Sequence, residues 1–210
     1  MAEFPFDALS PQERYKMLCA AVIPRPVAWI TSLDLDGTVN AAPFSFFNVF
    51  AEDPALVIIG MNRRPGGARK DTLNNIEARG EFVVNLADTK MAEALVATAA
   101  GFPPGVSEPE VLGLALAASS RIVTPRLEDA PIALECRLFE ARAIGPDRHL
   151  VMGEVKALVA RDGLFDETTR RMTAPHYDPV ARLYAQGYAR LAEPYDMAIP
   201  DWRTLASNDP

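Results

Sequence analysis

The chain has few cysteines and few histidines, which limits the metal and redox sites that it could form. Its 210 residues include two cysteines and two histidines. Neither Cys19 nor Cys136 has a second cysteine nearby, so the sequence predicts neither a zinc site nor a CxxC redox pair. We therefore expect two buried thiols and no metal site.

Long hydrophobic runs are also absent. A helix that spans a bilayer needs roughly 18 or more consecutive apolar residues, and Arg, Asp, Glu or Pro interrupts every candidate segment of this chain. The first residues, MAEFPFDALSPQER, lack the cationic start and the apolar stretch of a secretory signal. We expect a cytoplasmic protein that does not bind membranes.

The chain is short of positive charge. Its 21 Lys and Arg residues are outnumbered by 28 Asp and Glu residues, which gives a formal net charge of −7. Such a charge repels a phosphate backbone, so we predict no nucleic-acid partner. A local basic cluster could still hold a small phosphate.

What is present is the composition of an ordinary globular protein, with 49% hydrophobic and 23% charged residues. At about 100–200 residues per domain, this length predicts one domain over residues 1–210. We expect a core over about residues 20–165, an N-terminal helix, and a C-terminal tail that wraps the core or a neighbouring subunit.

The N-terminal helix is predicted from its cap. Ser10-Pro11-Gln12-Glu13 has the pattern of a capping box with proline at the first helical position, and predicts a helix to about Ala21. Apolar residues recur along it at helical spacing. We expect this face to cover one end of the core through Tyr15, Leu18, Cys19 and Val22.

Strands joined by hairpins dominate the chain up to residue 165. Runs 26–34 and 38–50 flank the turn-forming pair Asp36-Gly37 and predict a hairpin. Pro43 cannot donate a ladder hydrogen bond, so it should lie at a sheet edge or a bulge. Further strands are expected over 55–62, 81–87, 130–145 and 149–163, with helices over 71–80 and 88–101 and a proline-rich excursion or lid over 102–118. About six strands in hairpins, with helices inserted between them, predict a mainly β fold with added helices, an antiparallel barrel.

A basic loop is the first candidate site. Arg63, Arg64, Arg69 and Lys70 fall within eight residues, just before a helix for which Asp71 or Thr72 is the expected N-cap. A helix N-terminus offers unpaired N–H groups and the positive end of the helix dipole, so this arrangement favours phosphate binding. A solvated basic loop remains the alternative interpretation.

A second candidate is the aromatic segment NAAPFSFFN, residues 40–48, in which polar side chains alternate with three phenylalanines. Flat apolar walls with a few hydrogen-bonding groups suit a planar heteroaromatic ligand, although the same pattern fits a core strand. Thr31 and Ser32 lie on the partner strand of the hairpin, and their hydroxyls could reach such a ligand. His149 begins the last strand, where it is either a solvent-facing residue or a proton donor.

These segments resemble a known family. The stretch IPRPVAWITSLDLDGTVNAAPFSFFNVF, residues 23–50, is similar to flavin reductase-like, FMN-binding split-barrel proteins, the group that includes flavoredoxins and the reductase components of two-component monooxygenases. The resemblance continues through KDTLNNI, EFVVNL, LEDAPIALEC and HLVMGEV and covers roughly residues 20–160. It implies a six-stranded antiparallel Greek-key split barrel, usually a homodimer, that holds FMN noncovalently near the subunit interface.

The resemblance also implies roles for individual residues. It implies that the hydroxyls of Thr31 and Ser32 contact the flavin. It also implies that Lys70, Asp71 and Thr72, beside Arg69 of the basic loop, bind the flavin phosphate. It implies that His149, the one candidate catalytic residue, lies near the flavin or the nicotinamide. The segment that would line the flavin ring and ribityl chain contributes Asn40, Ala42, Phe44, Ser45, Phe46, Phe47 and Asn48.

The family resemblance implies an NAD(P)H:flavin oxidoreductase, with NADH or NADPH as donor and a small-molecule acceptor or a partner oxygenase as recipient of the electrons. The alternatives are an FMN-bound electron carrier or sensor, a small-barrel nucleic-acid binder and a haem-binding barrel. One departure concerns the tail, because many relatives carry Arg-Leu-Gly-Gly where this chain has Arg182-Leu183-Tyr184-Ala185, ahead of Tyr188. Nicotinamide access could therefore differ from that of the usual reductase.

Overall fold

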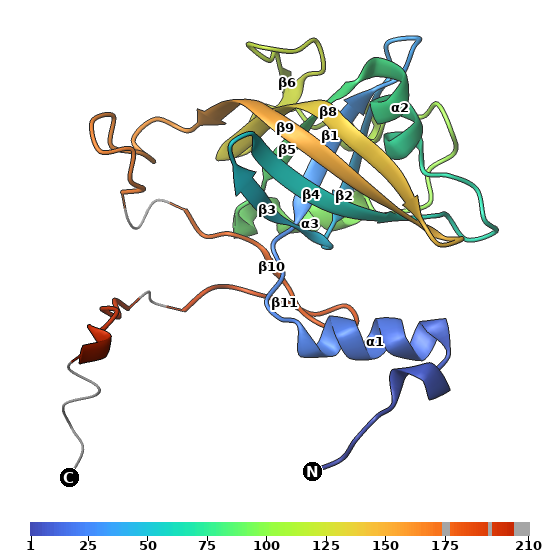
Figure 1. Ribbon diagram of the computed structural model, residues 1–210. Helices are drawn as coiled ribbons and strands as arrows, with labels where there is room; N and C mark the ends of the chain where they lie inside the picture. Colours follow the sequence, from blue (N-terminus) through green and yellow to red (C-terminus); the bar gives the residue numbers. More distant parts are fainter. Residues whose placement is uncertain (174–176, 193–194, 204–210) are drawn as a thin grey trace.

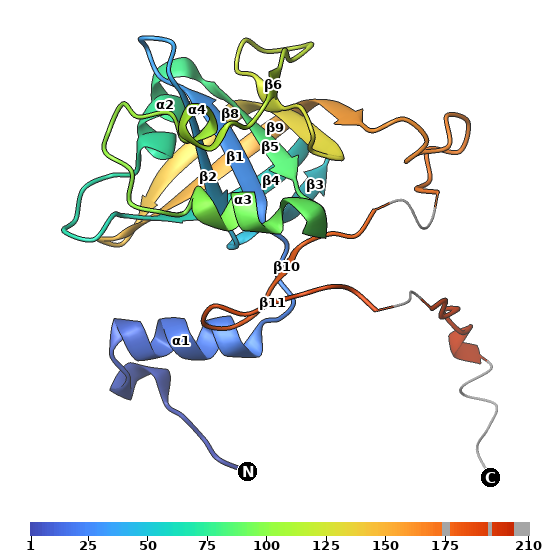
Figure 2. The same ribbon diagram turned by 180° about the vertical axis from the view of Figure 1, so that it is seen from behind.

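The fold is built on one large antiparallel sheet that curls on itself (Figures 1 and 2). The computed structural model describes residues 1–173, 177–192 and 195–203. The strands of the sheet follow the spatial order β2-β1-β5-β8-β9-β4-β3. Their bounds are β1 (Ala28–Leu33), β2 (Val39–Phe44), β3 (Phe47–Glu52), β4 (Ala55–Asn62), β5 (Glu81–Leu86), β8 (Ile132–Ile144) and β9 (Arg148–Ala160).

The mainly β class and both predicted hairpins are confirmed, but the sheet has seven strands where the sequence predicted six. The difference arises in run 38–50, which breaks at Ser45 and Phe46 into β2 and β3, the two edges of the sheet. The Gly60 N–H donates to the Phe46 carbonyl at 2.7 Å, and this bond holds the connection between the two edges against β4. Pro43 lies in edge strand β2, as its missing N–H predicted.

The core fills the inside of the curled sheet. Alternate residues of the strands point inward, and the largest of these side chains are fully buried. The long β8–β9 hairpin crosses the whole barrel, and Gly153 on β9 lies against the ring of Phe82 on β5. The core includes Ile30, Ile59, Met61, Phe82, Val84 and Val151 from the strands and Ile76 from the helix over residues 71–79.

Helices and short strands cover the barrel. Helix α2 (Asp71–Arg79) ends at Gly80, whose φ of 71° suits glycine, as predicted. Its N-cap is Lys70, which precedes the expected Asp71 or Thr72, and no side chain caps it. Segment 88–101 forms η2 (Thr89–Met91) and α3 (Ala92–Ala97), so the helix ends earlier than Gly101. The excursion continues through α4 (Glu108–Leu112), β6 (Leu116–Ala117) and β7 (Arg126–Leu127).

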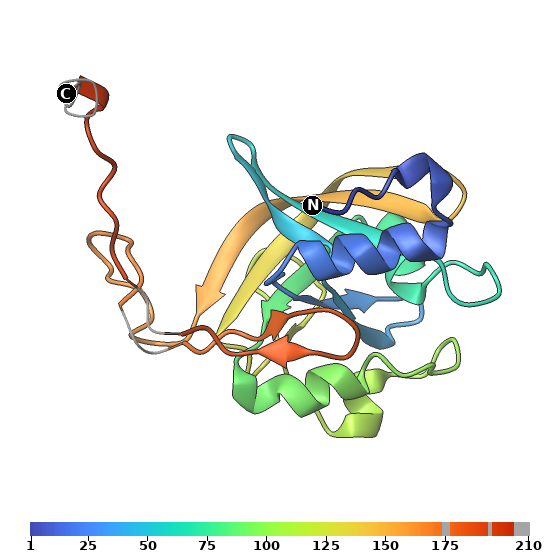
Figure 3. The same ribbon diagram turned by 90° about the horizontal axis from the view of Figure 1, so that it is seen from below.

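The N-terminal helix does not cover the core. Helix α1 (Pro11–Ala21) follows the short η1 (Phe6–Ala8), and both hydrogen bonds of its predicted capping box are present. Of its predicted core face only Cys19 is buried, while Tyr15, Leu18 and Val22 are exposed to 51%, 47% and 58%. The expectation was wrong because α1 lies below the barrel beside the hairpin of β10 (Ala181–Arg182) and β11 (Tyr188–Ala189), as Figure 3 shows. Cys136 is buried in the barrel, so both thiols are buried as expected.

Arg25 joins α1 and the hairpin to the barrel. Its side chain is 8% exposed and donates hydrogen bonds to the carbonyls of Cys19 and Val22 at the end of α1 and of Leu183 in the hairpin. Its backbone also pairs with that of Arg182. One buried cation therefore fixes two segments that are far apart in sequence.

Across the described ranges, no helix has the length and apolar character of a membrane span. The same residues contain no cluster of three or more His, Cys, Asp or Glu side chains suited to a metal ion.

Candidate functional site

Three adjoining cavities follow strand β2 and together form what we call the β2 groove. The polar cavity, of about 160 Å³, shares Asn40 and Asp71 with the basic cavity, of about 390 Å³. The basic cavity in turn shares Pro43 and Ala99 with the hairpin cavity, of about 610 Å³. The larger two lie within the size range of small-molecule sites, roughly 300–1,000 Å³.

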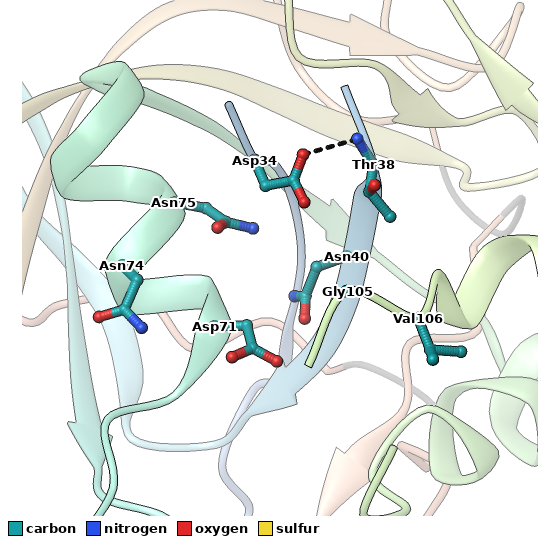
Figure 4. A pocket seen from close by; sticks show the side chains of 8 residues that line it. All are labelled: Asp34, Thr38, Asn40, Asp71, Asn74, Asn75, Gly105 and Val106. Atoms are coloured by element: carbon teal, nitrogen blue, oxygen red, sulfur yellow. Dashed lines mark hydrogen bonds between the residues drawn. The ribbon is translucent and has the colours of Figure 1, made fainter. Parts of the chain in front are cut away.

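The polar cavity lies between β2 and the first turns of α2 (Figure 4). In Figure 4 the side chains of Asn40, Asp71 and Asn75 point toward one another, and Asp34 accepts a hydrogen bond from the Thr38 N–H. The Asn75 amide also donates to the Ser32 hydroxyl at 3.2 Å. Most of the residues that line this end of the groove carry hydrogen-bonding side chains, and Gly105 and Val106 complete it.

The basic cavity combines cations with the N-terminus of α2. Arg64 pairs with Asp71, whereas none of the ion pairs between described residues involves Lys70. The Lys70 ammonium lies 5.4 Å from the centre of the Phe44 ring, and burial, followed by the charge of Arg64, lowers its pKa. Thr72 accepts a hydrogen bond from the Asn40 amide at 3.0 Å, which leaves its own proton free to donate. The first N–H groups of α2 have no intrahelical acceptor, so the cavity can receive an anion.

Glu108, the first residue of α4, closes the basic cavity from the side of the excursion. It is 4% exposed, and its carboxylate accepts the backbone N–H of Ala41 on β2 at 2.9 Å. Burial raises its pKa, and the Ala41 hydrogen bond acts in the opposite direction. A carboxylate held in this way fixes the backbone of β2 where the strand lines the groove.

The hairpin cavity is wider and less polar. Its walls come from the connection after β2, the end of α3, helix α1 and the β10–β11 hairpin. The residues that line it are Tyr15, Val27, Pro43, Ser45, Val96, Ala99, Arg182, Gln186 and Tyr188.

About half of the predicted site residues come together in the groove. Asn40 and Ala42 line it from β2, Ser45 from the following connection, and α2 with its N-cap contributes Lys70, Asp71 and Thr72. The prediction that a basic loop and a helix N-terminus meet the aromatic segment is consistent with this geometry.

The other members of the aromatic segment lie elsewhere. Phe44 is buried in the core, and Phe46, Phe47 and Asn48 line two further hollows near α1 and the start of β1, which share Ser45 and Val27 with the hairpin cavity. Arg69 pairs with Glu77 and lines none of the three cavities. The segment divides because the chain changes sheet edges at Ser45 and Phe46.

Thr31, Ser32 and His149 are not among the residues that line the groove. The buried Thr31 hydroxyl donates to the Pro125 carbonyl at 2.7 Å and accepts from Asn85, so its hydrogen bonds are used within the fold. His149 lies on β9, where it is half-buried and is the register partner of Met61 on the neighbouring strand β4.

Sequence reasoning missed Glu108, Arg182 and Tyr15 as site residues. Glu108 lies 67 residues from the N–H that it binds, and nothing in its neighbourhood of the sequence indicates that partner. From the sequence, residues 182–185 stood out only because they lack the two glycines that many relatives carry there. In the structure Tyr184 is 54% exposed and does not line the hairpin cavity, whereas Arg182 does.

Comparison with known proteins gives one consistent family. A family model described as a flavin reductase like domain matches residues 20–188. The structure of 2-nitrobenzoate 2-nitroreductase of Pseudomonas fluorescens is 36% identical, with a TM-score of 0.87 over 95% of this chain and 96% of that one. Nitrilotriacetate monooxygenase component B of Bacillus cereus is 34% identical, with a TM-score of 0.88 over 94% and 98%. An uncharacterized protein of Halalkalibacterium halodurans is 36% identical over 96% of this chain and 97% of its own length.

Proposed function

Because the chain belongs to the flavin reductase-like domain family, we propose that its β2 groove binds FMN and that the protein is an NAD(P)H:flavin oxidoreductase. The observation that carries the proposal is the set of groups that meet in the groove. Cations and a helix N-terminus line the basic cavity, beside the hydrogen-bonding side chains of Asn40 and Thr72, and rings and aliphatic groups line the adjoining hairpin cavity. FMN needs the same three kinds of group, for its phosphate, its ribityl hydroxyls and its flat ring.

The residues present fit that cofactor. Lys70, which has no carboxylate partner among the described ion pairs, and the first N–H groups of α2 would hold the phosphate. Asn40 and Thr72 would hydrogen-bond to the ribityl chain. A bound flavin would supply the redox chemistry, which is hydride transfer from NAD(P)H together with a proton from water to give NAD(P)⁺ and reduced flavin.

The protein's own contribution to catalysis is positioning. Holding two rings at reacting distance can remove several kcal/mol from a barrier without an acid or base residue. The Ala41 N–H is fixed by Glu108, and Asn40 by Thr72, so this part of the groove is ordered before any ligand enters. His149 lies outside the lining of the groove, so no proton transfer is assigned to it.

We further infer a homodimer that passes electrons to an acceptor or a partner oxygenase. The exposed apolar side chains of Leu18 on α1, of Val22 at its C-cap, and of Val49 and Phe50 on β3 support the dimer. The relative from B. cereus is named as a monooxygenase component, and the relative from P. fluorescens as a reductase of a nitroaromatic acid. Sedimentation of the pure protein tests the dimer.

The proposal is tested by the visible spectrum of the protein, recorded after reconstitution with FMN and again after anaerobic addition of NADH or NADPH. A bound flavin spectrum that bleaches with one donor supports the oxidoreductase and identifies the donor. Bound flavin that neither donor reduces favours the electron carrier or sensor. Failure to bind FMN contradicts the cofactor assignment.

The phosphate end is tested by Lys70→Ala. Loss of a charge-assisted hydrogen bond costs about 1.5–3 kcal/mol, so the Kd for FMN should rise by about 10- to 100-fold. Fluorescence quenching of FMN measures it, and Lys90→Ala, an exposed lysine outside the groove, is the matched control. An unchanged Kd for Lys70→Ala contradicts the assignment of the phosphate to the basic cavity.

A further inference from the structure

The hairpin cavity contains a cation to which the proposed mode of flavin binding assigns no role. Its lining contains one cation, Arg182, and no carboxylate, although the chain as a whole carries a net charge of −7. Two tyrosines, Ser45 and Gln186 supply further polar groups, and aliphatic side chains complete the walls. A cavity of this kind suits a planar ligand with one anionic group.

Arg182 is held in place yet keeps most of its donors. Its guanidinium stacks on the Tyr188 ring, 4.5 Å from the ring centre, and donates one hydrogen bond to the Ala185 carbonyl. No ion pair between described residues involves it. Since a guanidinium carries five N–H donors in a rigid fork, four remain for a ligand, and such a fork matches carboxylate and phosphate oxygens.

The cavity is assembled by segments outside the barrel. Tyr15 comes from α1, and Arg182 comes from the hairpin that Arg25 ties to α1. Burial raises the pKa of the Tyr15 hydroxyl, and the charges of Arg148 and Arg182 act in the opposite direction, so this hydroxyl lies in the field of both guanidiniums. The field at this end of the groove therefore favours an anion.

We propose that the hairpin cavity binds the reactant that exchanges electrons with the flavin, and that Arg182 recognises an anionic group on that reactant. The inference rests on the proposed function, because it places the reactant in the hairpin cavity beside the flavin ring, with the flavin phosphate in the adjoining basic cavity. Two ligands share this chemistry: the pyrophosphate of a reduced nicotinamide dinucleotide and the carboxylate of an aromatic acid.

The test compares ligands with and without the anionic group. NADH is compared with 1-benzyl-1,4-dihydronicotinamide, which has the same reacting ring and no phosphate, and benzoate is compared with benzamide. Reduction kinetics give KM for the donors, and calorimetry with and without FMN gives Kd for benzoate, benzamide and NAD⁺. The variants are Arg182→Gln and Arg182→Lys, with the exposed Arg121→Gln as control.

In Arg182→Gln we expect binding of the anionic ligand to weaken by about 10- to 100-fold, the usual loss of a charge-assisted contact, and binding of its uncharged counterpart to change by less than about threefold. Arg182→Lys should give an intermediate value, because it keeps the charge and loses the fork. A selective effect on NADH and NAD⁺ identifies the nucleotide as the ligand, and a selective effect on benzoate identifies an aromatic acid.

Equal effects on charged and uncharged ligands, or no effect in either Arg182 variant, overturn the proposal. The melting temperature and the Kd for FMN of each variant must match those of the wild type, and Arg182→Lys replaces Arg182→Gln if the latter does not fold. If the wild type fails to bind FMN, the proposed function fails, while calorimetry on the FMN-free protein still decides whether Arg182 binds the anion.

Discussion

At the residue scale, the groove depends on a few polar side chains that must satisfy one another while they leave room for a ligand. Asn40 binds Thr72, Glu108 binds the Ala41 N–H, and Arg64 pairs with Asp71. Three cations that line the groove, Arg63, Lys70 and Arg182, have no such carboxylate partner among the described residues. Cations without an acidic partner therefore lie in both the basic cavity and the hairpin cavity, where we propose anions to bind.

Glu108 gives a prediction about pH. Burial raises its pKa above the ordinary 4.5, so its contribution to stability is fully present below about pH 4.5 and is lost as pH rises through the raised pKa. Glu108→Gln cannot ionise and can still accept the Ala41 N–H. We expect this variant to melt at a higher temperature than the wild type at pH 7, with a smaller difference at pH 4.

Thermal melts at the two pH values measure the effect, and Glu110→Gln, an exposed acid on the same helix, is the control. A Glu108→Gln variant that is less stable than the wild type at pH 7 would show that the ionised carboxylate is needed to hold β2.

At the element scale, α1 and the β10–β11 hairpin act as one attachment to the barrel, and Arg25 is their common support. Arg25→Met should leave the carbonyls of Cys19, Val22 and Leu183 without this donor, at a cost of about 2 kcal/mol for the attachment. Hydrogen exchange should accelerate in residues 11–21 and 181–189 and remain slow in the barrel strands.

The control for this prediction is Arg14→Met, because Arg14 is a partly buried arginine on the same helix with one hydrogen bond, to the Phe6 carbonyl. Equal exchange rates in the wild type and Arg25→Met would mean that other contacts, such as the stacking of Tyr15 on Phe46, hold the attachment.

At the scale of the whole molecule, the packing inside the curled sheet depends on a small residue at position 153. A Cβ added at Gly153 would lie 2.4 Å from the Phe82 ring, and Phe82 is fully buried. Gly153→Ala should therefore lower the free energy of unfolding by about 1–3 kcal/mol through overpacking. Urea denaturation measures the loss, and Gly101→Ala, where a Cβ meets nothing within 4 Å, should leave stability nearly unchanged.

The sequence by itself determined the local elements and the family. The capping box of Ser10 and Glu13, the stop at Gly80 and the β8–β9 hairpin are set by residues close together in the chain, and each is present in the structure. The basic loop was recognisable for the same reason, since its cations and the helix that follows them are adjacent in sequence.

Only the tertiary structure decided which segments meet. The hydrophobic spacing of α1 does not specify its partner, and the helix packs beside the hairpin, with most of its predicted core face exposed. Glu108 reaches β2, and Arg182 shares a cavity with Tyr15, because the excursion, α1 and the hairpin all pack around the curled sheet. Such contacts depend on how the sheet edges and the added segments pack, and local propensity does not encode that packing.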